Sequence, residues 1–316
     1  MNETNYKSTG IDFVCVGFPK GGTTWLYERL SELPDFSMPL QKEIHFFDRS
    51  KKYPSSRHLE ESLLRNRFIT QKKWILKQIS HTFLKVIKLD FKSTLFFIKW
   101  YFSDYDNKWY LSLFNLGKGI SGDITPTYCL LDDGDVERMS EVLPEDIKLI
   151  FILRNPIERA WSHFRMVMRK RGKLKLEEYN FEEIKSFLVS DGQVMRTDYN
   201  NTIDRYKKYF PNNHLYISFY DFLNENPSQF LENIVEFLGG NPTNVNIYCS
   251  IDKKVKKSIK ASIPIEIESL LHKQYYQLIL ELSTKFGGYC TQWLSEIDDR
   301  IDKPSKEKLM PYLILK

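Results

Sequence analysis

Three short apolar segments, each followed by turn-forming residues and a helical pattern, constrain the fold of this chain more than any other feature. Each is rich in β-branched and aromatic residues and is therefore predicted to be a buried strand, at 11–17, 147–153 and 214–219. The helices that follow are expected at 23–33, from about 157, and at 227–238. Strands that alternate with helices form parallel sheets whose two faces are both covered. The sequence therefore predicts an α/β fold of three layers, with a mostly parallel sheet between helices.

The length of the chain favours one domain over two. Its 316 residues can bury one substantial core, and 42% hydrophobic with 28% charged residues is ordinary for a folded protein. We expect a single domain over 1–316. Within it we expect a helical basic insertion at 51–115, a long helix at 264–286 and a C-terminal tail at 303–316.

Cysteine usage and hydropathy argue against several classes of protein. The four cysteines are scattered, without a Cys-x-x-Cys pair or a Cys/His cluster at metal spacing, so neither a zinc site nor a disulfide framework is expected. The first ten residues lack the apolar run of a signal peptide. The most apolar stretch, residues 74–102, is interrupted by charges too often to span a membrane. A cytoplasmic protein without a bound metal is the expectation.

The positive charge of the chain is concentrated in one stretch. Residues 51–100 contain 12 Lys and Arg against 3 acidic residues, a local charge of +9 in a chain of net charge +5. Three interpretations fit this stretch: a lid for an anionic glycan, an amphipathic surface at a membrane interface, or a packed pair of helices with a basic outer face. Solvated basic faces are common, which slightly favours the last interpretation.

The loop after the first predicted strand has the composition of a phosphate-binding loop. It runs from residue 17 to 25 as Gly-Phe-Pro-Lys-Gly-Gly-Thr-Thr-Trp. Glycines let backbone N–H groups approach an anion, the N-terminus of the next helix adds positive potential, and Lys20 with two threonines adds charge and donors. A glycine-rich connector that only turns the chain is the simpler alternative.

A nucleotide kinase is the sharper alternative, and the spacing of the loop argues against it. The kinase loop G-x-x-x-x-G-K-[ST] needs a lysine directly after the last glycine, where it reaches the β- and γ-phosphates. Gly17 and Gly22 have the required spacing, but Thr23 occupies the lysine position and Lys20 comes earlier. The loop is therefore expected to hold a different arrangement of phosphates.

Two segments resemble the nucleotide-binding motifs of P-loop sulfotransferases, which use 3′-phosphoadenosine-5′-phosphosulfate (PAPS), and most of all their carbohydrate and heparan sulfate-type branch. Residues 19–25 are similar to the family's 5′-phosphosulfate loop, in which the lysine contacts the leaving phosphate and the tryptophan stacks on adenine. Residues 154–162 are similar to its 3′-phosphate motif, where an Arg can fork onto a phosphate while a Ser hydroxyl adds a hydrogen bond. The resemblance assigns nucleotide binding to Lys20, Gly21, Gly22, Thr23, Thr24, Trp25, Arg154 and Ser162.

A third segment resembles a catalytic motif of the same family. Residues 42–48, Lys-Glu-Ile-His-Phe-Phe-Asp, are similar to the K-E-x-H-F-F-D of the glycosaminoglycan branch, where the glutamate is the general base and the histidine belongs to the same cluster. The resemblance makes Lys20, Glu43 and His45 the expected catalytic residues. An extended segment would place Glu43, His45 and Phe47 on one face. The alternative is structural, with Glu43 paired to the preceding lysine or a nearby arginine and His45 a core histidine.

Two further segments match the family less closely. Residues 122–128, Gly-Asp-Ile-Thr-Pro-Thr-Tyr, resemble the family's G-E-x-[ST]-P-x-Y, but Asp replaces Glu and Ile124 stands where heparan-type enzymes carry a catalytic lysine. The basic run 253–260 occupies the place of a loop that closes over the nucleotide, which makes Lys257 and Ser258 candidate ligands. A solvated basic face is the alternative for this run.

The resemblance also implies the reaction. A sulfuryl group passes from PAPS to a hydroxyl or amine of an acceptor by in-line displacement, with Glu43 as base, 3′-phosphoadenosine-5′-phosphate (PAP) as product and no metal. The implied acceptor is a glycan or a glycosylated small molecule, and the basic insertion makes an anionic glycan attractive. A non-enzymatic nucleic-acid binder is the remaining alternative, and its affinity would fall steeply with salt. Neither a nucleic-acid partner nor a membrane span is expected.

Overall fold

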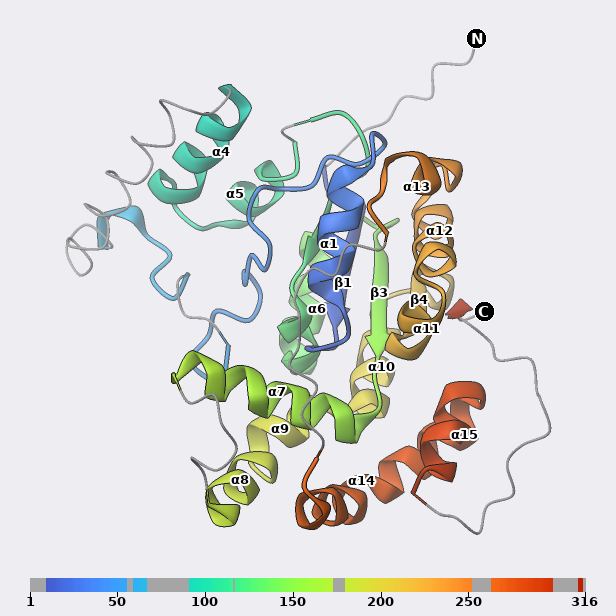
Figure 1. Cartoon of the computed structure of the whole chain (residues 1–316). Coiled ribbons are helices and arrows are strands. Elements are labelled where there is room, and N and C mark those ends of the chain that lie inside the picture. Colours follow the sequence, from blue (N-terminus) through green and yellow to red (C-terminus); the bar gives the residue numbers. More distant parts are fainter. Residues whose placement is uncertain are drawn as a thin grey trace.

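The fold is built on one five-stranded sheet in which four neighbouring strands are parallel. The computed structural model describes residues 10–55, 59–66, 91–115, 117–172, 180–251, 263–297 and 312–314. The sheet has the strand order β2-β1-β3-β4-β5 (Figure 1). Its strands are β1 (Phe13–Gly17), β2 (Gly122–Ile124), β3 (Lys148–Leu153), β4 (Leu215–Phe219) and β5 (Tyr312–Ile314). The first four pair in parallel and β5 pairs antiparallel with β4, which confirms the predicted mostly parallel sheet.

Helices connect these strands and cover the sheet. A 3-10 helix, η1 (Pro126–Leu130), follows β2, and a second, η3 (Asn212–His214), precedes β4. The α-helices are α1 (Thr23–Glu32), α4 (Phe91–Phe102), α5 (Asn107–Ser112), α6 (Asp133–Val142), α7 (Pro156–Lys170), α8 (Phe181–Leu188), α9 (Asp191–Met195), α10 (Tyr199–Lys207), α11 (Tyr220–Glu225), α12 (Pro227–Leu238), α13 (Thr243–Tyr248), α14 (Ile265–Phe286) and α15 (Gly288–Ser295).

Side chains of the central strands pack against helices on both faces of the sheet. Tyr216 of β4 packs on Phe237 of α12, with 5.0 Å between ring centroids. Tyr216 pairs in register with Ile150 of β3, and the next residue, Phe151, packs on Tyr206 of α10 at 5.5 Å. Successive strand residues point to opposite faces, so α12 and α10 lie on different sides of the sheet. Figure 1 shows α1 on the same side as α12, which confirms the predicted three layers.

The strands are apolar throughout because both faces of the sheet are covered. All five residues of β1 and all five of β4 are buried, and so are five of the six residues of β3. A strand with only one covered face would instead alternate apolar and polar residues. The continuous apolar runs that predicted these strands are therefore a direct consequence of the layered fold.

The junctions after β1 and β3 place two loops side by side. α1 begins after Gly22, whose φ of 88° lies in the left-handed region that favours glycine. α7 begins at Pro156, the first helical position, where a backbone N–H has no intrahelical partner and its absence in proline costs nothing. The Asn155 side chain accepts from the N–H of Ile157 at 3.0 Å. Because β1 and β3 are parallel neighbours, both junctions lie at the same edge of the sheet.

Two predicted segments are described only in part. Within the helical insertion predicted at 51–115, α4 and α5 are helices, and residues 67–90 lie outside the described residues. Residues 312–314, which the sequence placed in a tail, form β5. Three residues are too few to show the apolar pattern by which a strand is recognised. In the part of the chain that the structure describes, no helix combines the length and the hydropathy needed to cross a membrane.

Candidate functional site

The loop between β1 and α1 turns its backbone sharply at the edge of the sheet. The N–H of Phe18 donates to the carbonyl of Ile152 at 3.1 Å, and the N–H of Gly21 donates to the carbonyl of Phe18 at 3.0 Å. A Cβ at Gly21 would lie only 2.6 Å from the Ile152 oxygen, so the backbones approach too closely for a larger residue. Lys20 and Gly22 have positive φ of 76° and 88°. Such turns, followed by the unpaired N–H groups of a helix N-terminus, favour a bound anion.

Lys20 and Trp25 extend from this loop in directions set by neighbouring helices. Nζ of Lys20 lies 3.8 Å from Sδ of Met166 on α7. The indole of Trp25 meets Phe230 of α12 edge-on at 6.1 Å and lies 6.0 Å from the Arg29 guanidinium. The Trp25 side chain is partly exposed. A partly exposed aromatic ring beside a loop of this kind suits a planar base.

Arg154 brings the second predicted cation into contact with the first loop. It follows β3, and its Nη1 donates to the backbone carbonyl of Lys20 at 3.1 Å. Its Nη2 and Nε lie 2.9 and 3.2 Å from Oε2 of Glu158, one turn into α7. The guanidinium also stacks on the Tyr220 ring, 4.1 Å from the centroid. The structure thus joins the two motifs that lie more than a hundred residues apart in the sequence.

The remaining predicted nucleotide ligands fall into two groups. Ser162 lies on α7 after Arg154 and is largely buried. Lys257 and Ser258 lie outside the described residues, as does the rest of the basic run after residue 251. The two strand-to-helix junctions therefore meet at one edge, while the contribution of the basic run stays a prediction.

The segment that carries Glu43 and His45 is not extended, unlike the geometry considered from the sequence. Glu43 and His45 have φ of 61° and 59°, in a region that residues with a Cβ adopt uncommonly. Oε2 of Glu43 nevertheless lies 3.7 Å from Nε2 of His45, and Lys42 forms a close ion pair with Oε1 of Glu43. Each such backbone conformation costs roughly 1–3 kcal/mol and persists only where surrounding contacts enforce it. The two side chains meet because the segment coils, not because it alternates.

The charges around Glu43 keep its carboxylate ionised. Burial opposes ionisation, but the interaction with His45 at 3.7 Å and the charge of Lys42 outweigh it and lower the pKa of Glu43 to about 2. Burial also opposes charge on His45, yet Asp48 and Glu43 raise the pKa of His45 to about 9. Ile124, for which the resemblance noted in the sequence implies a lysine in heparan-type enzymes, is buried and adds no charge. The pairing with Lys42 that the structural alternative expected for Glu43 is thus present, together with the contact with His45.

Asp48 and Thr127 hold His45 from the side opposite Glu43. Nδ1 of His45 lies 2.9 Å from Oδ2 of Asp48, whose side chain is fully buried. Oγ1 of Thr127 donates to the same Oδ2 at 2.6 Å and lies 3.3 Å from His45 Nδ1. A partner on one ring nitrogen fixes the direction of the other, so Nε2 faces Glu43. Both residues belong to the motifs recognised in the sequence, but nothing in the sequence showed that they converge on His45.

A buried network around Asp123 supports the segment that carries the base. Asp123 accepts from Tyr128 at 2.7 Å, from Tyr110 at 3.0 Å and from Thr125 at 2.6 Å. The Tyr128 hydroxyl in turn accepts from the backbone N–H of Phe46 at 3.0 Å. Complete burial raises the pKa of Asp123, and the three donors oppose that rise. The aspartate that replaces the family's glutamate therefore acts here as a structural anchor.

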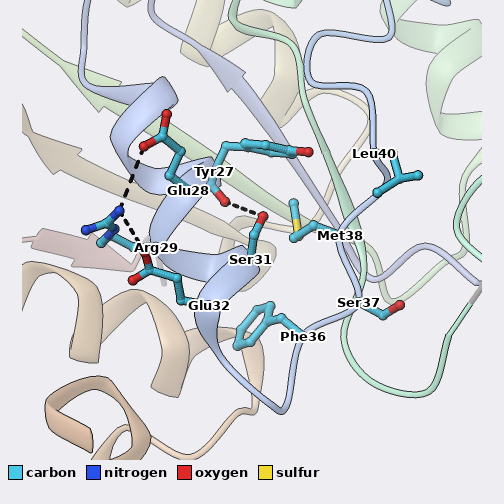
Figure 2. A pocket seen from close by; sticks show the side chains of 9 residues that line it. All are labelled: Tyr27, Glu28, Arg29, Ser31, Glu32, Phe36, Ser37, Met38 and Leu40. Atoms are coloured by element: carbon cyan, nitrogen blue, oxygen red, sulfur yellow. Dashed lines mark hydrogen bonds and ion pairs between the residues drawn. The ribbon is translucent and has the colours of Figure 1, made fainter. Parts of the chain in front are cut away.

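A separate open pocket lies beside the second half of α1 (Figure 2). Glu28 and Glu32 in its walls carry negative charge, which does not suit an anionic nucleotide. The pocket shares no residue with the predicted nucleotide-binding and catalytic residues. Its volume is about 440 Å³, and its walls are formed by Tyr27, Glu28, Arg29, Ser31, Glu32, Phe36, Ser37, Met38 and Leu40.

The histidine, cysteine and acidic side chains of the described residues bear on metal binding, which the sequence did not predict. Within those residues, no group of three or more His, Cys, Asp or Glu side chains is arranged to hold an ion. All four cysteines are free thiols. The groups that these residues offer for chemistry are the cations at the sheet edge and the ionised carboxylate of Glu43.

Comparison with known proteins links this arrangement to one family. The profile of the Sulfotransferase family matches residues 12–242, which include both strand-to-helix junctions and the Glu43 segment. A sulfotransferase from Alicyclobacillus acidocaldarius aligns with a TM-score of 0.52 at 19% identity, over 92% of this chain and 97% of that one. A sulfotransferase domain from the curacin biosynthetic pathway aligns with a TM-score of 0.48 at 19% identity, over 94% of this chain and 92% of that one. No curated protein matches the sequence.

Proposed function

This chain belongs to the sulfotransferase family, and on that premise we propose that it transfers a sulfuryl group from PAPS to a hydroxyl or amine. The observation that carries the proposal is the contact between the two anion-binding junctions, in which Arg154 donates to the backbone of Lys20. Two cations on neighbouring strand ends suit a nucleotide that bears phosphate on both its 5′ and 3′ sides. Thr23, at the lysine position of a kinase loop, disfavours the nucleoside triphosphate alternative.

The chemistry of the junction residues fits PAPS. Lys20 and the N–H groups at the start of α1 would hold the 5′-phosphosulfate, and Trp25 would stack on the adenine. Arg154 and Ser162 would hold the 3′-phosphate, with the phosphate taking the place of Glu158 beside the guanidinium. That replacement is favourable because the Glu158 side chain is 55% exposed and its ion pair is weak in water. When bound, PAPS supplies an activated sulfuryl group on a phosphate leaving group.

We propose Glu43 as the general base. Its carboxylate is ionised at neutral pH, so it can take a proton without first losing one, and the pKa lowered to about 2 makes it a weaker base than an ordinary glutamate. Glu43 removes the proton of the acceptor as the acceptor oxygen or nitrogen attacks sulfur. Lys20 stabilises the negative charge that develops on the leaving phosphate oxygen. His45, held by Asp48, keeps the Glu43 carboxylate oriented during the transfer.

We propose a glycan or a glycosylated small molecule as the acceptor, with an anionic glycan favoured by the charge of +9 over residues 51–100. The described part of that stretch has a packed apolar side. Phe96 and Trp100 of α4 are buried and stack on each other at 5.8 Å. Their burial supports packed helices with a basic outer face, and such a face can still attract an anionic acceptor.

Calorimetry without metal separates the proposed function from its alternatives. We expect the chain to bind PAP, and to bind ATP or an oligonucleotide far more weakly. A nucleic-acid binder would instead bind the oligonucleotide with a steep dependence on salt. Transfer of labelled sulfate from PAPS to a panel of glycans, phenols and lipids then identifies the acceptor class. Failure to bind PAP would remove the proposal.

Two variants test the assigned roles. Lys20→Ala should lower kcat by a factor on the order of 10²–10³, and Glu43→Gln by a factor on the order of 10²–10⁴. Lys108→Ala and Glu141→Gln, on exposed positions of α5 and α6, are the matched controls and should leave the rate unchanged. Near-normal turnover in either test variant would remove that residue from the mechanism.

A further inference from the structure

A chain of polar contacts behind the phosphate loop determines the protonation of His163. Arg159 on α7 is fully buried, and its Nη2 donates to Oε1 of Gln193 on α9 at 2.7 Å. Nε2 of Gln193 lies 2.9 Å from Nδ1 of His163. A guanidinium can only donate, so the Gln193 atom that faces it is the amide oxygen and the atom that faces His163 is the NH2 group. Nδ1 of His163 is therefore an acceptor, and the ring is neutral with its proton on Nε2.

The surroundings of His163 also disfavour a charged ring. Burial, followed by the charges of Arg196 and Arg159, lowers the pKa of His163 to about 3; the hydrogen bond with Gln193 acts in the opposite direction without offsetting them, and the charge of Lys20 adds to the lowering. Arg196 donates to two backbone carbonyls, and Nε and Nη1 of Arg159 have no hydrogen-bond partner among the residues that the structure describes. Phe187 on α8 covers one side of the ring, at 5.6 Å between centroids. The imidazole thus stays neutral among cations.

α7 presents His163 on the side of the helix that contacts the phosphate loop. Met166, three residues further on, lies 3.8 Å from Nζ of Lys20, and residues three apart share a helix face. Figure 1 shows α7 crossing below the carboxyl end of β3, beside the start of α1. The His163 side chain is partly exposed, and its contact with Gln193 uses Nδ1 alone. Nε2–H is therefore available to a ligand at the loop.

We propose that Nε2–H of His163 donates a hydrogen bond to the phosphosulfate anion that Lys20 holds, and that Gln193 and Arg159 are positioning residues that fix its tautomer. This inference rests on the proposed function, because it requires PAPS at the phosphate loop. A neutral imidazole gives a directed hydrogen bond to the anion without exchanging a proton with the acceptor. Donors held in place before the reaction stabilise developing charge most effectively.

Nitrogen-15 NMR of the imidazole rings in the intact chain tests the proposal directly. The six histidines give few signals, and the His163 signal is the one lost in His163→Gln. We expect the Nε2–H tautomer, no titration between about pH 5 and pH 8 since the group stays neutral there, and a shift of Nε2 on ligand binding. A shift with PAP and with a non-transferable PAPS analogue identifies the 5′-phosphate as the acceptor, and a shift with the analogue alone identifies the sulfuryl group.

The outcomes separate this inference from the proposed function. Binding of PAP by calorimetry, with no change at Nε2 of His163 in the presence of either PAP or the non-transferable PAPS analogue, would overturn the inference alone. Absence of binding by the wild type would overturn the proposed function and the inference with it. A cationic ring at neutral pH would contradict the assigned tautomer.

Kinetics give a second readout. His163→Leu removes the donor and should lower kcat by a factor on the order of 10², with a change in the KM for PAPS of less than about threefold. His163→Gln places an amide N–H near the former Nε2 and should recover about tenfold of the lost rate. Equal kcat in His163→Leu and the wild type would refute the proposal, and the NMR measurement decides the case if the leucine variant does not fold.

The positioning role of Gln193 has its own test. In Gln193→Glu a carboxylate faces Nδ1 of His163, so the ring should gain a proton and titrate between about pH 5 and pH 8. Gln277→Glu, on an exposed position of α14, is the matched control and should leave the His163 signal unchanged. A ring that stays neutral in Gln193→Glu would show that the amide does not set its protonation.

Discussion

Replacing Asp48 with Asn should remove a pH-dependent part of the stability of this protein. The pKa of His45 is raised from 6.5 to about 9 by Asp48 and Glu43, against the effect of burial. A shift of that size corresponds to about 3 kcal/mol of folding free energy. The Glu43–His45 contact also lowers the pKa of Glu43. The free energy of that contact is included in the shift of His45 and is not added again for Glu43.

The direction of the pH dependence follows from the raised pKa. The folded state binds the His45 proton more tightly than the unfolded chain does. The stabilisation is therefore complete below pH 6.5, declines as the pH rises, and is lost above about pH 9. In Asp48→Asn the buried ring loses its main charged partner and keeps Glu43, so its pKa should fall toward 6.5. The difference in unfolding free energy between the wild type and Asp48→Asn should then shrink by up to about 3 kcal/mol as the pH rises from about 6 to 9.5.

Urea unfolding across this pH range measures the effect, with each free energy extrapolated linearly to water. Groups that titrate alike in both proteins cancel in the difference. His45→Gln is the control background, because it lacks the imidazole. Adding Asp48→Asn to His45→Gln should therefore lower the unfolding free energy by an amount that does not depend on pH. Parallel stability curves for the wild type and Asp48→Asn would refute the assignment of the ion pair.

Three further predictions concern the phosphate loop and its neighbours. Gly22→Ala should lower the unfolding free energy by at least about 1 kcal/mol, because φ is 88° and the new Cβ would meet Cδ2 of Leu223 at 2.4 Å; urea unfolding at wild-type stability would contradict this. Trp25→Ala should weaken PAP binding by roughly 5- to 150-fold and Trp25→Phe much less, as measured by calorimetry; equal affinities would argue against adenine stacking. Burial lowers the pKa of His163 to about 3, so only the unfolded chain binds a proton at His163 as the pH falls below 6.5. The wild type should therefore lose more unfolding free energy than His163→Gln between about pH 6.5 and pH 4.

The parts of the fold that could be predicted from the sequence are those set by local patterns. The strand predicted at 147–153 is β3 at Lys148–Leu153, and the helix predicted at 227–238 is α12, which ends at Gly239 with φ of 90°. Burial on both faces of the sheet and the residues at helix ends leave direct marks in the sequence. The turn between β1 and α1 was predictable for the same reason, and phosphate binding by that loop stays a prediction.

The parts that could not be predicted depend on distant contacts. The left-handed conformations of Glu43 and His45 accompany a hydrogen bond from the N–H of Phe46 to Tyr128, 82 residues away. The contact of Nδ1 of His163 with Gln193 likewise spans 30 residues of the chain. No local pattern encodes such pairings, because each residue alone has an ordinary neighbourhood.

The short strand β5 bears on how the protein avoids self-association. Its pairing with β4 occupies backbone groups that would otherwise face other molecules, through Tyr216 with Ile314 and Ser218 with Tyr312. Open strand edges act as templates on which further chains add by backbone hydrogen bonding. At the opposite border the outermost strand, β2, has only three residues and offers a poor template. Resistance to intermolecular sheet growth on the β4 side therefore depends on a few residues that lie nearly a hundred positions away in the chain.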